Sequence, residues 1–138
     1  METDVISWKR VEDLTKSLWE KVSQQSIKFH SISTISRGGL VPARLMADIM
    51  GIDKILVDQN QIPRDSLFVD DIFDSGNTFK KILAKAEEPK SLVYATLFAR
   101  IGKQYPKQVI FAIQTKGLEY VVFPWEIYEN KRLEEIQS

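Results

Sequence analysis

The sequence predicts an α/β fold with a doubly wound, mainly parallel sheet flanked by helices, and three observations support this prediction. Short apolar runs alternate along the chain with stretches in which apolar residues recur at steps of three and four. Most of these runs are hydrophobic at nearly every position, which is typical of parallel strands covered on both faces. Two of them lead into turns rich in glycine, serine and charged residues, and such turns form ligand crevices at the carboxyl edge of open sheets.

The first half of the chain supplies two helices and a strand. A helix is expected over residues 8–22, where apolar side chains follow helical spacing. Residues 31–35 read as a strand that ends in a glycine-rich turn. A second helix is expected over residues 40–50, with Pro42 in its first turn and Gly51 at its C-cap.

The second half continues the alternation. A helix is expected from residue 77 to about residue 88, where it stops before Pro89. No repeat, low-complexity tract or linker interrupts the pattern, so residues 1–138 are expected to form a single domain. The remaining strands are expected at residues 54–57, 67–69, 91–98, 108–113 and 120–123.

Composition and charge narrow the class of protein. Lys and Arg together number 19, and so do Asp and Glu, so no overall basic charge favours nucleic acid as a partner. The chain has no cysteine, which excludes disulfides, a thiolate nucleophile and a cysteine-ligated metal. No apolar run has the length of a membrane span, and no signal-peptide pattern is visible. A cytoplasmic enzyme without membrane contact is expected.

The most informative segment follows the apolar run at residues 67–69. Small residues at a strand-to-helix turn leave backbone N–H groups available to hold an anion. Two adjacent acids are costly without a ligand or cation, and they can hold sugar hydroxyls or a hydrated metal. The segment therefore predicts a site for a phosphorylated sugar with a metal ion, although Asp74 or Ser75 could instead only cap the helix. Its polar members are Asp70, Asp71, Asp74, Ser75, Gly76, Asn77 and Thr78.

A second turn has matching chemistry. Ser36, Arg37, Gly38 and Gly39 come directly before the helix expected over residues 40–50. The two glycines let the backbone approach a ligand closely, and the N-terminal helix dipole and Arg37 both favour an anion. Taken alone, this turn could also be no more than a tight connection between a strand and a helix.

Residues 68–78 resemble the phosphoribosyl-diphosphate (PRPP) signature of the type I phosphoribosyltransferases, in which apolar residues precede two acids, two variable positions and an Asp-Ser/Thr-Gly-x-Thr turn. A nucleotide P-loop and a GxGxxG motif are both missing from the sequence. The resemblance implies that Ser36, Arg37, Gly38 and Gly39 hold the diphosphate of PRPP. It also implies a Mg²⁺ cofactor and a homodimer or homotetramer.

The resemblance assigns roles to the acid-rich segment as well. Asp70 and Asp71 would hold the ribose hydroxyls, directly or through the water shell of Mg²⁺, which keeps few protein ligands. Backbone N–H groups of the turn would surround the 5-phosphate, and Asp74 would face N7 of the incoming base. Asp74 and Arg37 are therefore the expected catalytic residues. The turn consists of Asp74, Ser75, Gly76, Asn77 and Thr78.

The C-terminal third is similar to the xanthine-guanine branch, which transfers to 6-oxopurines. Arg100 stands where that branch has a lysine that donates to the purine O6, and an arginine fork is bulkier and differently aimed. Tyr120 would stack on the base and the backbone of Val121 would read its exocyclic groups. Phe123 and Trp125 could instead only pack the edge of the sheet against a helix or a subunit partner. Separately, transfer to another acceptor, such as adenine or a pyrimidine, stays an alternative.

One feature departs from the family. Its members carry a long mobile flap between the second and third strands, whereas only residues 58–66 join the corresponding strands here. The chain is therefore expected to have a short flap and a reduced hood, the smaller part that covers the site. These would shield the reacting centre from water less well than the long flap of the family does. Two functions are therefore expected as alternatives: a purine phosphoribosyltransferase, or a regulatory protein that binds PRPP or a purine nucleotide with little turnover.

Overall fold

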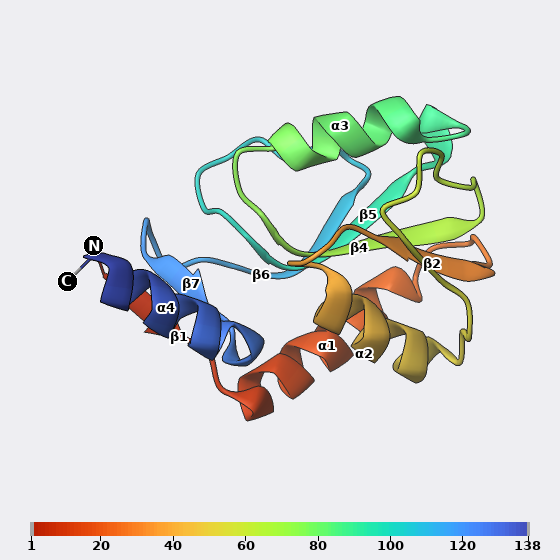
Figure 1. Cartoon of the computed structure of the whole chain (residues 1–138). Coiled ribbons are helices and arrows are strands. Elements are labelled where there is room, and N and C mark those ends of the chain that lie inside the picture. Colours follow the sequence, from red (N-terminus) through yellow and green to blue (C-terminus); the bar gives the residue numbers. More distant parts are fainter. Residues whose placement is uncertain (1, 138) are drawn as a thin grey trace.

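The computed structural model describes residues 2–137 and has a five-stranded, fully parallel sheet at its centre (Figure 1). The strands pair in the order β3-β2-β4-β5-β6. This confirms the predicted α/β class with its parallel sheet. The strands are β2 (Ser31–Thr34), β3 (Ile55–Val57), β4 (Ser66–Phe73), β5 (Val93–Ala99) and β6 (Val109–Gln114).

Helices cover both faces of the sheet, as a doubly wound fold requires. Helices α1 (Trp8–Val22) and α2 (Leu40–Met50) lie on one face, and α3 (Asn77–Lys85) lies on the other (Figure 1). Each face has its own apolar core, which includes Leu18 of α1 on the first side and Phe79 of α3 on the second. The C-cap of α2 is Gly51 in the left-handed conformation, as expected from the sequence.

Strand β4 is longer than the sequence indicated, and this changes where the acids lie. The apolar run ends at Val69, but pairing with β5 continues through Asp70 opposite Thr96 to Phe73 opposite Ala99. The acid pair therefore belongs to the last part of a strand and does not follow it. Backbone pairing overrides the low strand propensity of aspartate here.

Two other boundaries also differ from the prediction. Helix α3 ends at Lys85 and not near residue 88, because Ala86 is extended and forms a parallel bridge with Ile62. A short 3₁₀ turn, η1 (Pro89–Ser91), then leads into β5. The connection from α3 to the next strand is thus tied to the loop that precedes β4.

The C-terminal strand does not join the main sheet, contrary to the prediction. Strand β7 (Tyr120–Val122) pairs with β1 (Thr3–Val5) in a separate parallel ladder, followed by η2 (Pro124–Glu126) and α4 (Ile127–Gln137). Phe123 and Trp125 stack at 4.6 Å between ring centroids, and Phe123 also packs edge-on against Phe98. These two aromatic residues therefore have the packing role that the sequence left as an alternative.

None of the helices within residues 2–137 combines the length and apolar character needed to cross a membrane.

Candidate active site

The two predicted segments meet at the carboxyl edge of the sheet, because one follows β2 and the other begins in the last part of the adjacent strand β4. Strands β2 and β4 pair directly, with Thr34 opposite Val69. A Cβ atom on Gly38 would lie only 2.8 Å from Oδ2 of Asp71, so the backbone of one loop passes against the carboxylate of the other. The glycine loop (residues 36–39) and the acid loop (residues 70–78) therefore line one site.

Asp70 points into the protein, where a tyrosine holds it. Its side chain is buried, Oδ1 accepts the backbone N–H of Asp71 at 2.8 Å, and Oδ2 accepts the hydroxyl of Tyr94 at 2.9 Å. Tyr94 of β5 is itself buried and stacks on Phe68. Because both carboxylate oxygens are engaged, Asp70 mainly positions its neighbour, and burial raises its pKa.

The carboxylate of Asp71, unlike that of Asp70, points toward the glycine loop. Its Oδ1 accepts the N–H of Ile72 at 2.7 Å, while Oδ2 faces the backbone of Gly38. Burial, together with the charge of Asp70, raises the pKa of Asp71 to about 8. Two crowded carboxylates with raised pKa values favour a bound cation. The oxygen donors fit Mg²⁺, which Asp71 would hold with water and substrate oxygens completing the shell.

Replacing Asp71 with asparagine should stabilise the free protein in a pH-dependent way. A carboxyl whose pKa is raised on folding contributes stability below its unfolded pKa, and this is lost as pH rises through the folded value, about 8. Asparagine does not ionise, so Asp71→Asn should gain on the order of 2 kcal/mol at pH 9 and little at pH 4. Urea titrations at both values measure this, with exposed Asp53→Asn as the control. A gain that does not depend on pH would contradict the account.

The far end of the acid loop forms the start of α3. Gly76 is the N-cap at φ 88°, a left-handed conformation that suits glycine, and the first helical bond runs from Lys80 N–H to Gly76 C=O. The first N–H groups of a helix have no partner within it and point toward an anion. A hollow of about 180 Å³ opens here, lined among others by Asp70, Asp71, Asp74, Ser75, Gly76 and Thr78.

Arg100, at the end of β5, links the acid loop to the connection between β6 and β7. Its side chain is only 10% exposed, and Nε donates to Oδ1 of Asp74 at 3.1 Å. Nη1 donates to the carbonyls of Gly117 at 3.1 Å and Glu119 at 2.8 Å. Of the guanidinium nitrogens, only Nη2 makes no hydrogen bond to residues 2–137. Arg100 thus fixes Asp74 and keeps one nitrogen for a ligand.

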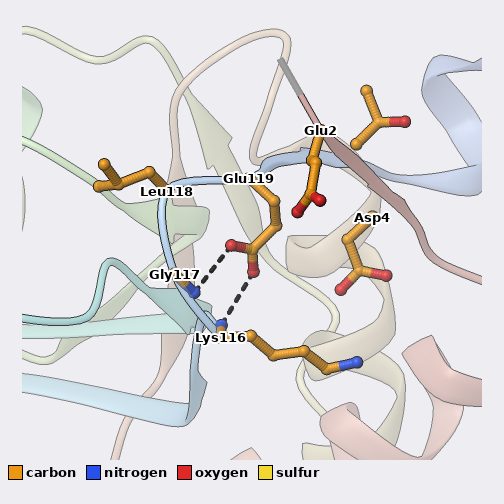
Figure 2. A pocket seen from close by; sticks show the side chains of 7 residues that line it. Glu2, Asp4, Lys116, Gly117, Leu118 and Glu119 are labelled. Carbon is orange, nitrogen blue, oxygen red and sulfur yellow. Dashed lines mark hydrogen bonds between the residues drawn. The ribbon is translucent and has the colours of Figure 1, made fainter.

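The connection that accepts hydrogen bonds from Arg100 is also held by the side chain of Glu119 (Figure 2). The carboxylate of Glu119 accepts the backbone N–H groups of Lys116 and Gly117, both at 2.8 Å. These contacts lower the pKa of Glu119 against an opposing effect of desolvation, which is the largest single contribution. The conformation of residues 116–119 is therefore fixed by two side chains: Glu119 accepts two of its backbone N–H groups, and Arg100 donates to two of its carbonyls.

The two expected base-binding residues of β7 have opposite exposures. Tyr120 is 47% exposed and lines a second hollow with Asp74 and Arg100. Partial burial, with the charges of Glu126, Glu129 and Asp71, raises the pKa of Tyr120. The side chain of Val121 is buried in the core, which leaves only its backbone for contact with a ligand.

The donors of the glycine loop face carboxylates of the chain itself. Arg37 Nη2 lies 3.5 Å from Oε1 of Glu129 in α4. Ser36 donates its N–H to Oδ1 of Asp58 at 2.9 Å and its hydroxyl to Oδ2 of the same residue. A third hollow, of about 600 Å³, separates this loop from α4 and is lined among others by Arg37, Gly38, Trp125, Tyr128, Glu129 and Arg132.

The connection between β3 and β4 is short, as expected, and backbone hydrogen bonds of Ile62 fix its position. Ile62 is 2% exposed, donates its N–H to the carbonyl of Lys85 at 2.9 Å, and accepts the N–H of Glu87 at 2.8 Å. One contact is with the last residue of α3 and the other lies just beyond its C-terminal end, whereas the acid loop lies at its N-terminal end. After Asp58, which contacts Ser36, residues 59–65 therefore lead away from the site and do not cover it.

Sequence reasoning missed three contributors to the site. Tyr94 carries a hydroxyl in a strand whose other residues, apart from Thr96, are apolar, and that was an available signal. Asp58, directly after a short strand, carried the same signal as Asp70 and was not singled out. Glu129 had none, because its place beside Arg37 depends on how α4 returns toward the glycine loop.

Known structures with this architecture include purine phosphoribosyltransferases. The xanthine-guanine-hypoxanthine phosphoribosyltransferase of Helicobacter pylori is 18% identical, with a TM-score of 0.75 over 97% of this chain and 99% of that one. A purine phosphoribosyltransferase of Pyrococcus horikoshii is 23% identical, with a TM-score of 0.70 over 91% and 94%. A hypothetical protein of Neisseria gonorrhoeae with bound ppGpp is 19% identical, with a TM-score of 0.71 over 99% and 98%.

No family model and no curated protein sequence matches the chain. Backbone similarity at these identities, together with the two loops at adjacent strand ends, establishes the architecture. The chain has the type I phosphoribosyltransferase fold.

Proposed function

We propose that the chain catalyses Mg²⁺-dependent transfer of ribose 5-phosphate from PRPP to a 6-oxopurine base (guanine, xanthine or hypoxanthine), with release of diphosphate. The observation that carries the proposal is the approach of Gly38 to the carboxylate of Asp71, which joins two anion-binding loops in one site. PRPP has a phosphate at one end and a diphosphate at the other. It would span the two loops with its ribose over the acid pair.

Each group has a chemical task in this reaction. N9 of the base forms a bond to C1 of the ribose while the bond from C1 to the diphosphate oxygen breaks, and its electron pair leaves with the diphosphate. Asp74 accepts the proton from N7 of the base. Arg37 and the N–H group of Gly38 bind the departing anion, whereas the N–H of Gly39 donates to the carbonyl of Ile35 at 3.1 Å. Catalysis is mainly positioning and electrostatic stabilisation. Mg²⁺, when bound, neutralises part of the diphosphate charge.

The preference for a 6-oxo group rests on Arg100. Its remaining nitrogen, Nη2, can donate hydrogen bonds but cannot accept them. A carbonyl at C6 satisfies such a donor, whereas the amino group of adenine does not. Tyr120, in the same hollow, offers its ring for stacking on the purine.

Two variants of Arg100 should separate selectivity from positioning. Arg100→Lys keeps a donor and a charge but loses the fork that joins Asp74 to two carbonyls. We expect kcat/KM for hypoxanthine to fall about 10- to 100-fold, with the preference over adenine retained. Arg100→Gln can also accept a hydrogen bond, so the preference should shrink at least about tenfold. Steady-state rates with both bases measure this, and an unchanged preference in Arg100→Gln would refute the assigned role.

The proposed reaction itself is tested by product formation. The protein is incubated with PRPP, Mg²⁺ and guanine, hypoxanthine or xanthine, and nucleotide and diphosphate are quantified. Equal amounts of both products are expected with at least one base, and chelation of the metal should abolish them. Diphosphate without nucleotide would mean hydrolysis only, and no product with any base would remove the proposal.

A second function, binding of PRPP or a purine nucleotide for regulation, is favoured by the pinned connection between β3 and β4. Because Ile62 is fixed at the C-terminal end of α3, the loop lacks the reach to exclude water from the site. The related Neisseria gonorrhoeae protein has ppGpp bound. This function predicts thermal stabilisation by PRPP or a guanine nucleotide without product formation.

A further inference from the structure

Asp58 binds the glycine loop in the way that a phosphate group would. Its two carboxylate oxygens each take one donor of Ser36, Oδ1 from the backbone N–H at 2.9 Å and Oδ2 from the hydroxyl. Both donors belong to the loop that the proposed function gives to the diphosphate. An anion supplied by the chain itself therefore already occupies part of that loop.

The backbone holds Asp58 in this place. It is the first residue after β3, and its N–H donates to the carbonyl of Thr34 at 3.1 Å, which extends the ladder between β2 and β3. Its φ of 54° lies in the left-handed region, which is uncommon for residues other than glycine, although aspartate is among those that tolerate it. The hydroxyl of Ser36, together with its N–H, lowers the pKa of Asp58 and keeps it ionised.

We propose that Asp58 is a built-in anion that caps Ser36 in the free protein, so that a diphosphate-bearing ligand binds by displacing it. The inference rests on the proposed function only for the assignment of residues 36–39 to the diphosphate. Only molecules in which Ser36 is uncapped bind the ligand, so the apparent affinity for diphosphate is the intrinsic affinity multiplied by the fraction of such molecules. Asp58 would thus set how tightly the loop holds diphosphate before and after transfer.

The exchange is local because the rest of the connection is anchored. Ile62 is fixed at the far end by its two backbone bonds to Lys85 and Glu87, at the C-terminal end of α3. Only the three residues between Asp58 and Ile62 are then left to accommodate the released carboxylate, and all three are exposed. The short connection between β3 and β4 therefore binds the glycine loop through Asp58 and does not shield the site from water.

The test measures binding of inorganic diphosphate with Mg²⁺ by calorimetry. Asp58→Gly removes the carboxylate at a φ that glycine adopts without strain, and Asp58→Asn keeps one acceptor without the charge. Asp53→Asn is the control, because it removes an exposed carboxylate that lies before β3, whereas Asp58 directly follows that strand. Hydrogen exchange at the Ser36 amide and the unfolding temperature show that each variant is folded and whether Ser36 is released.

Asp58→Gly should bind diphosphate about tenfold more tightly or better, with faster exchange at Ser36 in the free protein. Asp58→Asn should lie between it and wild type, and Asp53→Asn should bind diphosphate within about threefold of wild type, as expected for an exposed residue away from the site. Unchanged or weaker binding by Asp58→Gly would overturn the inference alone. Absence of diphosphate binding in every form would overturn it together with the loop assignment. Tighter binding without transferase activity would sustain it and remove the proposed reaction.

Discussion

Asp74→Asn should lower kcat/KM for base transfer by about 10²- to 10⁴-fold, the range found when a general base is removed. The carboxylate lies at the end of β4, 61% exposed, and is aimed by Nε of Arg100 at 3.1 Å. Asparagine has nearly the same shape and still accepts this hydrogen bond, but it does not take a proton. The variant therefore removes the proton acceptor and leaves the geometry in place.

The loss should be confined to the chemical step. PRPP binding by calorimetry and the unfolding temperature should stay close to wild type, because Asp74 is exposed and Asn77, Thr78 and the N-terminus of α3 are untouched. Asp48→Asn removes an equally exposed carboxylate from α2 and serves as the control, with activity expected to be unchanged. Activity of Asp74→Asn within threefold of wild type would mean that another group takes the proton.

Gly39→Ala should destabilise the protein by about 2 kcal/mol or more and abolish diphosphate binding. A Cβ atom at this position would lie 2.0 Å from Oγ1 of Thr34 and 2.8 Å from the carbonyl oxygen of Val69. Thr34 Oγ1 donates to that same carbonyl at 2.6 Å, and Val69 lies in the middle of the sheet. Neither neighbour has room to give way, so the glycine loop must lift away from the acid loop.

Gly117→Ala is the matched control for this variant. Its Cβ would meet only Oε2 of Glu119, at 3.5 Å, which is an ordinary contact. Urea unfolding should place Gly117→Ala within about 0.5 kcal/mol of wild type. Equal stability of Gly39→Ala and wild type would show that the close packing of the glycine loop against β2 and β4 is wrong.

The sequence was sufficient for much of the fold because its local signals agree with one another. Apolar runs, the glycine C-cap at Gly51 and the glycine-rich turn after β2 all indicate alternating strands and helices. The strand ends were harder to place. Asp70 and Asp71 lie within β4 because β5 offers pairing partners beyond Val69, and that pairing is not a local property. Strand β1 is too short to show a period, and it determines where β7 goes.

The site was predictable where one segment carries the chemistry, and not where distant segments meet. The acid loop is continuous in sequence, and so is the glycine loop. The contact of Asp58 with Ser36 spans strands β2 and β3, and the bond of Tyr94 to Asp70 spans β4 and β5. Such contacts depend on strand order and register, and single-residue signals do not specify these.

The central claim is that the glycine loop and the acid loop form one PRPP site, and a calorimetric titration with PRPP and Mg²⁺ tests it most directly. One loop is altered by Arg37→Ala, in the turn after β2, and the other by Thr78→Ala, in the first turn of α3. We predict one molecule of PRPP bound per chain, with affinity reduced at least about tenfold by each variant, as expected when a charge-assisted contact is removed. Wild-type affinity in either variant, or two independent binding events, would contradict the claim.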